Sequence, residues 1–222
     1  MKKIDYNKVI DLTEHNIVLT PENSKAVNEK ERINTILIPQ KSLEKRVKAL
    51  AKQICHDYRN YDNLLVIPVL KGAFVFASDL LREMYRYRSF GLQLDFLKTS
   101  TYGKQIKGAG EFERKVVFDL EPKDIEKKDI LIVEDLIDQC FTITEIVKYL
   151  KKRKAASVRI CILLEKKIPD PSHKVAGLKK EFRCDYIGFI VPDVWVAGYG
   201  LDAGEDLRQL PFVAAVKEDL YR

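Results

Sequence analysis

The sequence predicts an α/β fold with a mainly parallel, twisted sheet flanked by helices, and three observations support this prediction. Short apolar runs recur along the chain, as expected for strands that are buried on both faces. Stretches with apolar residues spaced three and four apart, typical of amphipathic helices, separate several of these runs. No internal repeat or low-complexity tract interrupts the alternation. A chain of 222 residues with this pattern is expected to form one domain around a parallel sheet.

The first part of the chain predicts an extension, an edge strand and a helix. Residues 1–35 are mixed in character and are expected to form an N-terminal extension packed on a domain of residues 36–222. The run Ile36–Pro39 predicts a short edge strand, because proline cannot donate a ladder hydrogen bond. Ser42 is the expected N-cap of a helix whose apolar stripe covers residues 43–54.

The next part predicts a second strand and helix, followed by a long loop between two strands. Residues 64–70 form an apolar run, and a helical pattern follows over residues 73–84. The alternating residues 92–97 predict another strand, which residues 114–119 accompany as its return. Residues 98–110 are polar and rich in glycine, so they are expected to form a hairpin tip or a mobile lid.

The remaining chain repeats the alternation of strands and helices. The expected elements are strands at 130–133, 157–164, 186–191 and 212–216, a helix at 143–152, and a loop at 168–182. This order of elements favours parallel strands joined by crossover helices.

Charge is unevenly distributed along the chain, whose net charge is +6. Residues 148–183 carry twelve Lys and Arg against three Asp and Glu, whereas acidic residues outnumber basic ones by seven to three over residues 184–222. A basic region can attract nucleic acid. Because no interleaved aromatic residues or nucleic-acid motif accompany it, solvated helix faces that help to attract an anionic substrate are the preferred interpretation. No nucleic-acid partner is expected.

The cysteines and the apolar runs predict a cytoplasmic protein without a disulfide framework. The four cysteines are widely spaced and form no CxxC pair, which disfavours disulfides and a zinc site. No apolar run approaches the roughly 18 residues needed to span a bilayer. The first residues carry charge and lack the apolar core of a secretory signal. No membrane association is therefore expected.

The stretch from Asp129 to Thr142 carries the clearest chemical signal. An apolar run ends at Glu134 and Asp135, a third carboxylate follows at Asp138, and a short turn leads to a helix. Open α/β sheets bind ligands at the carboxyl ends of their strands, where this turn lies. Thr142 is expected to cap the helix, whose free N–H groups can hold an anion. The combination suggests a polyphosphorylated sugar or nucleotide held with a divalent metal.

Lys71 and Gly72 repeat this arrangement, because they follow one predicted strand and precede the next helix. Glycine lets a backbone approach a ligand closely, and the N–H groups at this point can meet a phosphate. By itself a Lys-Gly pair carries little information. Its position after a strand is what makes it a candidate phosphate site.

Five ordered segments resemble the purine phosphoribosyltransferases of the hypoxanthine-guanine type. In chain order they are 70–72, 101–102, 129–142, 163–166 and 191–208. They are similar to that family's pyrophosphate loop, mobile lid, signature for phosphoribosyl pyrophosphate, purine-carbonyl segment, and purine-stacking and metal-binding segment. The likeness extends from about Ile36 to Val216, and five motifs in the right order are much more specific than one.

The resemblance implies a type I phosphoribosyltransferase fold with a small base-binding hood, contributed by the N-terminal part and about residues 165–222. It implies a cytoplasmic, Mg²⁺-dependent purine salvage enzyme that transfers 5-phosphoribosyl from phosphoribosyl pyrophosphate to N9 of hypoxanthine or guanine. The products would be IMP or GMP and pyrophosphate. By the same resemblance we expect a homodimer or homotetramer.

The resemblance also assigns roles around the donor. Ribose and phosphate contacts are expected from Glu134, Asp135, Asp138, Gln139, Cys140, Phe141 and Thr142. Pyrophosphate contacts are expected from Lys71, Gly72 and Arg208. The Mg²⁺ contacts are expected from Glu134, Asp135 and Asp202. The lid residues are Thr101 and Tyr102, which would close over the donor and exclude water.

On the purine side, Asp138 is the candidate catalytic base near N7, and a simple helix N-cap is the alternative. Trp195 is expected to stack on the purine, although a lone tryptophan more often lies in a core. Lys166 is expected to donate to the 6-oxo oxygen, with its neighbour Lys167 as the competing alignment. Val196 is expected to present main-chain groups to the purine edge.

The sequence departs from the family pattern at Gln139 and Cys140, where a small hydroxyl residue and a glycine are usual. If the turn requires a positive φ at Cys140, its Cβ costs about 1 kcal/mol or more and narrows the phosphate pocket. The thiol at a helix N-terminus could also have a lowered pKa, although a neutral, space-filling thiol is favoured. The departure supports one alternative function, a catalytically weakened nucleotide-sensing regulator on the same fold.

Overall fold

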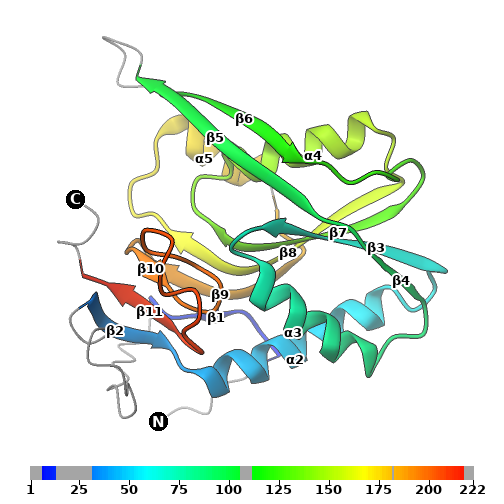
Figure 1. Cartoon of the computed structure of the whole chain (residues 1–222), viewed down its shortest axis with the longest axis horizontal. Coiled ribbons are helices and arrows are strands. Elements are labelled where there is room, and N and C mark those ends of the chain that lie inside the picture. The colour runs from blue at the N-terminus through cyan, green and yellow to red at the C-terminus, as the bar shows by residue number, and fades with distance from the viewer. Residues whose placement is uncertain (1–6, 14–31, 106–111, 182, 218–222) are drawn as a thin grey trace.

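The protein forms two sheets flanked by helices (Figure 1). The structure, a computed structural model, describes residues 7–13, 32–105, 112–181 and 183–217. Its elements in chain order are β1 (Ile10–Asp11), β2 (Ile33–Ile38), α2 (Gln40–Asp57), β3 (Asn63–Leu70), α3 (Phe74–Tyr85), β4 (Gly91–Leu94), β5 (Leu97–Gln105), β6 (Phe112–Leu120), β7 (Asp129–Ile137), α4 (Phe141–Lys152), β8 (Ser157–Lys167), α5 (His173–Glu181), β9 (Tyr186–Pro192), β10 (Val196–Ala197) and β11 (Val213–Val216).

The larger sheet has the order β1-β9-β8-β7-β3-β5-β6, and β4 also pairs with β3. Every pair in it is parallel except the β5–β6 hairpin. Helices α2 and α3 cover one face, and α4 and α5 cover the other (Figure 1). The predicted α/β fold with a mainly parallel sheet is confirmed.

Two apolar cores lie on the opposite faces of this sheet, because successive strand residues point to opposite sides. In β3, Leu64 and Val66 belong to the core shared with α2 and α3, whereas Leu65 and Ile67 belong to the core beneath α4. Strand β7 alternates in the same way. Strands buried on both faces explain the continuous apolar runs in the sequence.

A smaller sheet of three antiparallel strands has the order β10-β11-β2. Strand β2 begins at Ile33, three residues before the predicted edge strand. A separate cluster of buried residues packs under this sheet and includes Ala197, Leu207 and Val216. The sheet joins residues from the two ends of the described chain.

Part of the N-terminal extension belongs to the larger sheet. Strand β1 pairs in parallel with β9, with Ile10 opposite Phe189, and the Ile10 side chain is buried. The buried guanidinium of Arg46 on α2 donates to the backbone carbonyls of Ile187 and Gly188 in β9. Most of residues 1–35 lie outside the described residues.

The predictions for Ser42 and for residues 168–182 are wrong. The predicted N-cap Ser42 lies inside α2, which begins at Gln40, because the carbonyl of Pro39 already accepts hydrogen bonds from the N–H groups of Ser42 and Leu43. The predicted loop at 168–182 contains α5. This helix has only a weak apolar stripe, but its Val175 is buried.

The predicted strand at 92–97 is divided. Strand β4 ends at Leu94 and β5 starts at Leu97. Both strands pair in parallel with β3, and the two residues between them interrupt the pairing. Strands β5 and β6 extend the hairpin as far as Gln105 and Phe112, farther than a loop over residues 98–110.

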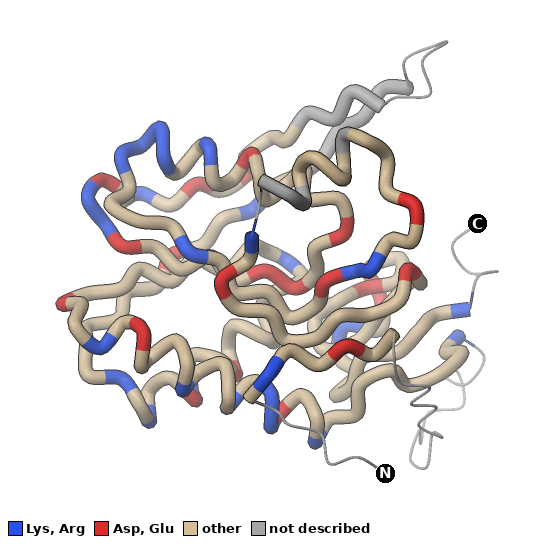
Figure 2. Tube along the Cα trace, turned by 180° about the vertical axis from the view of Figure 1, so that it is seen from behind, with Lys and Arg blue, Asp and Glu red and all other residues tan. Residues whose placement is uncertain are grey.

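The basic region contains ion pairs on its surface. Figure 2 shows acidic residues among the lysines and arginines of the chain. Around α4 the pairs are Lys148–Glu145, Arg153–Glu121, Lys154–Glu126 and Lys128–Asp124. Only the first pair lies within α4, and the other three involve the connector before β7, so acidic neighbours offset part of the basic charge. Among the described helices, none is long and apolar enough to cross a membrane.

Candidate active site

The carboxyl end of β7 carries the paired carboxylates. The strand continues to Ile137, which pairs with Glu165 of β8, so Glu134 and Asp135 lie within the strand rather than in the turn after it. Glu134 is buried with 9% of its surface exposed, although it is a carboxylic acid. The Asp135 N–H donates to Oε1 of Glu134 at 3.2 Å.

Burial places these two acids in an unfavourable environment for negative charge. Desolvation raises the pKa of Glu134 well above its usual value of 4.5, and the neighbouring Asp135 raises it further. Desolvation also raises the pKa of Asp135, and the charge of Arg208 acts in the opposite direction. A cation bound here would relieve the cost, because it favours the ionised form of both groups.

The turn after β7 forms a hollow of about 130 Å³. Its lining residues are Glu134, Leu136, Ile137, Asp138, Gln139, Cys140, Phe141, Thr142 and Ile143. Helix α4 begins at Phe141, and its first N–H groups lie at this hollow, as an anion site requires. Thr142 therefore lies inside the first turn, and its prediction as the cap is wrong because the helix starts earlier.

Cys140 precedes the helix in a left-handed conformation with φ of 64°. This is the positive φ that the family's glycine would tolerate without strain. The side chain is buried with 7% of its surface exposed, in the core beneath α4. No two of the four cysteines are joined in a disulfide.

Asp138 is partly buried and lines the hollow without serving as a helix cap. It lies two residues before Cys140, the residue at the cap position. Within the described residues its carboxylate makes no hydrogen bond to α4. The structure therefore gives no support to the interpretation of Asp138 as an N-cap.

The loop after β3 packs directly against the carboxylate of Asp135. A Cβ atom on Gly72 would lie 1.5 Å from Oδ2 of Asp135. Gly200 approaches the same loop, since a Cβ on it would lie 2.2 Å from the carbonyl oxygen of Gly72. The peptide bond between Leu70 and Lys71 is cis. Gly72 thus leaves room for the Asp135 side chain and Gly200 leaves room for the Gly72 backbone, so residues of three separate chain segments meet here.

Lys71 and Arg208 converge on a carboxylate that the sequence reasoning missed. Nζ of Lys71 lies 3.0 Å from Oε2 of Glu205, and one terminal nitrogen of Arg208 lies 3.1 Å from the same oxygen. Hydrogen bonds from Lys71 and then Arg208 lower the pKa of Glu205. Its spacing of three residues before Arg208 is compatible with a local pair, but no sequence signal connects it with Lys71.

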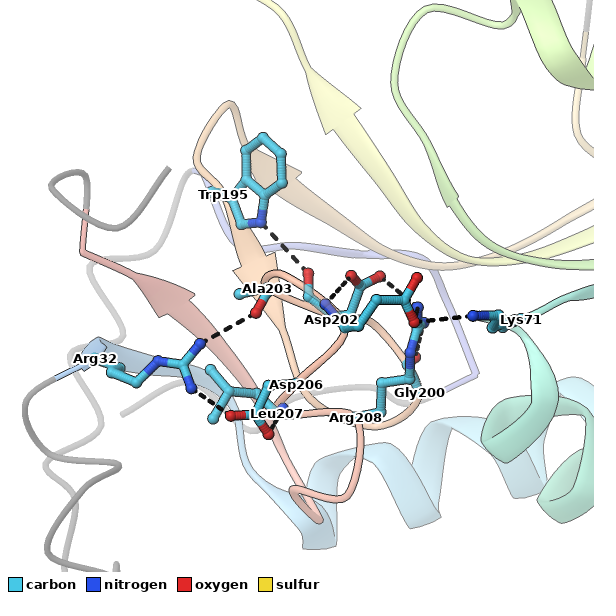
Figure 3. Close-up of polar contacts among 10 residues, drawn as sticks. Arg32, Lys71, Trp195, Gly200, Asp202, Ala203, Asp206, Leu207 and Arg208 are labelled. Atoms are coloured by element: carbon cyan, nitrogen blue, oxygen red, sulfur yellow. Dashed lines mark hydrogen bonds and ion pairs between the residues drawn. The ribbon is translucent and has the colours of Figure 1, made fainter. Parts of the chain in front are cut away.

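Arg208 is held by two further acceptors. It donates to the carbonyl of Gly200 at 2.9 Å, and it lies 2.9 Å from Oδ1 of Asp202. The other oxygen of Asp202 accepts the N–H of Glu205 at 2.9 Å. Figure 3 shows Lys71, Asp202 and Arg208 facing one another across this segment. The predicted metal contact Asp202 is thus already engaged by a cation and a backbone N–H.

The predicted purine-binding residues lie at adjacent strand ends. Glu165 of β8 lies opposite Ile137, the last residue of β7. Lys166 follows Glu165 and lies opposite Val191 of β9, so it is close to the carboxyl end of β7. Its side chain is 12% exposed, and Nζ lies 3.3 Å from Oδ1 of Asp193. Lys167 points elsewhere, to Thr13 near β1, with Nζ 3.1 Å from Oγ1. The two lysines therefore contact different parts of the molecule, Lys166 at Asp193 and Lys167 at Thr13.

Trp195 is 44% exposed, so it is not a core residue. Its Nε1 donates to the carbonyl of Asp202 at 3.4 Å (Figure 3), and its own carbonyl accepts from Val216. Val196 follows in β10, is buried, and pairs with Ala215. An indole with an exposed face, anchored through its nitrogen, is available for stacking.

The predicted lid residues lie in the β5–β6 hairpin. Thr101 pairs with Val116 and Tyr102 with Lys115, and the hairpin tip lies outside the described residues. At its base, Phe118 stacks on Tyr149 of α4 with ring centroids 4.3 Å apart.

Buried Glu134 beside partly buried Asp135, a turn before a helix N-terminus and two convergent cations at the carboxyl edge of a parallel sheet define an α/β protein whose site is suited to phosphorylated ligands. Residues 35–203 match the family described as the phosphoribosyl transferase domain. The hypoxanthine-guanine phosphoribosyltransferase of Dictyostelium discoideum is 35% identical over 187 residues, covering 84% of this chain and 97% of that protein. The chain belongs to the phosphoribosyltransferase family.

Further relatives agree. The hypoxanthine-guanine phosphoribosyltransferase of Bacillus subtilis is 38% identical over 192 residues, covering 86% of this chain and 98% of that protein. The crystal structure of a hypoxanthine phosphoribosyltransferase from Staphylococcus aureus has a TM-score of 0.75 at 29% identity, and covers 90% of this chain and 100% of that one. The resemblance inferred from the sequence and the type I phosphoribosyltransferase fold are confirmed.

Replacement of Glu134 by glutamine is expected to stabilise the unliganded protein at neutral and alkaline pH. The raised pKa means that the folded state resists ionisation, so wild-type stability falls as pH rises above 4.5, the usual value. The variant should melt higher at pH 8, by roughly 2–4 °C for each kcal/mol gained, and the difference should shrink toward pH 5. Thermal melts across this range measure it.

Glu126→Gln is the matched control, because Glu126 is an exposed acid far from the pair. It should show no comparable gain at pH 8. A Glu134→Gln protein whose melting temperature at pH 8 is below that of wild type contradicts the assigned cost of burial. A difference in melting temperature that is the same at every pH contradicts it too.

Proposed function

We propose that this chain is a purine salvage enzyme that transfers 5-phosphoribosyl from phosphoribosyl pyrophosphate to N9 of hypoxanthine or guanine. The products are IMP or GMP and pyrophosphate. The observation that carries the proposal is the meeting of the acidic pair, the hollow before α4 and the Lys71–Arg208 cations at one sheet edge. The names of the relatives support the choice of substrate class.

The donor's 5′-phosphate is assigned to the turn of residues 138–142, where α4 presents its first N–H groups. Glu134 and Asp135 are assigned to the ribose hydroxyls and the metal. Lys71, Gly72 and Arg208 are assigned to the pyrophosphate, for which an arginine offers paired donors and a glycine offers close backbone approach.

The residues present fit Mg²⁺ bound largely through the donor. No cluster of three His, Cys, Asp or Glu in the described ranges forms a ready-made cation cage. Mg²⁺ commonly takes one or two carboxylates together with substrate phosphates, and buried Glu134 and partly buried Asp135 supply oxygen ligands of this kind. Asp202 is the third proposed contact. When bound, the metal neutralises charge on the leaving pyrophosphate.

The purine is assigned to the small sheet, which would form the base-binding hood. Trp195 offers an exposed indole face for stacking. Lys166, held beside Asp193, would donate to the 6-oxo oxygen, and main-chain groups of Val196 would meet the purine edge. A lysine donor favours a 6-oxopurine over adenine, whose amino group is itself a donor.

In the proposed step, the purine reacts as its N7–H tautomer. The N9 lone pair forms a bond to C1 of the ribose, the bond from C1 to the pyrophosphate oxygen breaks, and pyrophosphate leaves with that electron pair. Asp138 takes the proton from N7. Thr101 and Tyr102 remain the predicted lid residues that exclude water during the step.

Turnover assays test the function directly. With phosphoribosyl pyrophosphate and Mg²⁺, hypoxanthine or guanine should yield a nucleotide, and adenine should not, because Lys166 selects a carbonyl. Formation of nucleotide and pyrophosphate is followed for hypoxanthine, guanine, xanthine and adenine in turn. No turnover with any base, together with measurable nucleotide binding, would favour the regulator over the enzyme.

The Asp138→Asn variant should lower kcat with hypoxanthine by about tenfold or more, because the amide cannot accept the N7 proton. Steady-state kinetics measure the change. Asp124→Asn, which alters an exposed acid outside the hollow, should leave kcat unaffected. An unchanged rate in Asp138→Asn defeats the assignment of the base.

The Cys140→Gly variant should lower the apparent KM for the donor, by about tenfold for each 1.4 kcal/mol of binding free energy gained, because Cys140 lines the hollow and removal of its Cβ widens the space for the phosphate. Cys140→Ala is the matched control, since it keeps Cβ and removes only the thiol. Donor KM should stay near wild type in Cys140→Ala. An unchanged KM in Cys140→Gly would show that the steric argument is wrong.

A further inference from the structure

We propose that Glu205 is an internal competitor for the pyrophosphate end of the site. Its carboxylate occupies the Lys71–Arg208 cations in the absence of ligand, and it thereby sets the affinity for pyrophosphate and the rate of its release. This inference rests on the proposed function, because it takes Lys71 and Arg208 as the pyrophosphate contacts.

The geometry is that of a bound anion supplied by the chain itself. One oxygen, Oε2 of Glu205, bridges Nζ of Lys71 at 3.0 Å and a guanidinium nitrogen of Arg208 at 3.1 Å. Lys71 lies 134 residues away in the sequence, so this is a tertiary contact rather than a local pair. A phosphate oxygen that binds both cations would need the same position.

The other contacts of Arg208 indicate that Glu205 can move away while Arg208 keeps its position. Arg208 is also held by the carbonyl of Gly200 and by Asp202, so its orientation persists without Glu205. Within the described residues, the Lys71 ammonium has an ion pair with Glu205 only. Displacement of Glu205 would therefore free Lys71 for a ligand while Arg208 stays in place.

Electrostatics require the displacement. Like charges placed a few ångströms apart repel each other, and the repulsion is stronger near a protein surface than in bulk water. A polyanion that approached Lys71 beside an undisplaced Glu205 would meet this repulsion. The Glu205 side chain is 67% exposed, and exposed ion pairs contribute little, so its removal costs little.

The expected consequence is that Glu205 lowers the affinity for pyrophosphate and raises the rate of its release. The competing carboxylate weakens pyrophosphate binding, since the ligand must exchange with Glu205 rather than enter an empty site. The same carboxylate returns to the cations as pyrophosphate departs. Glu205 would therefore speed the release of the leaving group without touching the purine or the ribose.

Calorimetric titration with inorganic pyrophosphate and Mg²⁺ at low salt tests the inference. The Glu205→Gln variant should bind pyrophosphate about two- to fivefold more tightly than wild type, as expected for loss of one competing exposed carboxylate. Glu205→Ala should show the same direction. Asp206→Asn is the matched control, because it makes the same charge change one residue away, where Asp206 pairs with Arg32.

Pyrophosphate binding that is unchanged or weaker in Glu205→Gln overturns the inference, as does an equal gain in Asp206→Asn, which would indicate a general effect of net charge. The proposed function is judged separately, by turnover of the wild-type protein. A wild type that turns over, with no tighter binding in Glu205→Gln, refutes only the role of Glu205. A wild type with neither turnover nor pyrophosphate binding refutes both.

Discussion

The close approach of three chain segments at Gly72 is the constraint on which the candidate site depends. The end of β7, the loop after β3 and the segment at Gly200 are far apart in sequence, yet Gly72 leaves room for the Asp135 carboxylate and Gly200 leaves room for the Gly72 backbone. Because the segments touch, Asp135, Lys71 and Arg208 surround one space. A side chain at either glycine would have to push the carboxylates and the cations apart.

The acidic group Glu134 lies buried in this space, whereas the cation Lys71 lies at its surface. Glu134 is buried, where ionisation is unfavourable, whereas Lys71 and Glu205 lie at the surface and face solvent. A ligand that carries both a metal ion and phosphates would satisfy both ends together, because the cation meets the acids and the anion meets the lysine and arginine. The unliganded protein thus holds groups whose best partners belong to the substrate.

Local pattern explains what the sequence could predict. Strand β7, the carboxylates after its apolar run, and Lys-Gly after β3 depend on neighbouring residues, so their pattern identified them. The bridge from Glu205 to Lys71 depends on tertiary proximity and left no local signal. The helix start at Phe141 was missed because Thr142 is a residue type that often caps helices, whereas Cys140 holds the cap position without a side-chain cap hydrogen bond. Helix α5 has too weak an apolar stripe to be recognised.

The small sheet has a consequence for how the protein forms during synthesis. Strand β11 is the middle strand, and it joins β2 to β10. A ribosome adds roughly 5–20 residues each second, so β2 emerges many seconds before its partner at residues 213–216 exists. The larger sheet can assemble while β2 waits unpaired. The proposed base-binding region would therefore be the last part of the molecule to become native, after the phosphate-binding turn of residues 138–142 has been synthesised.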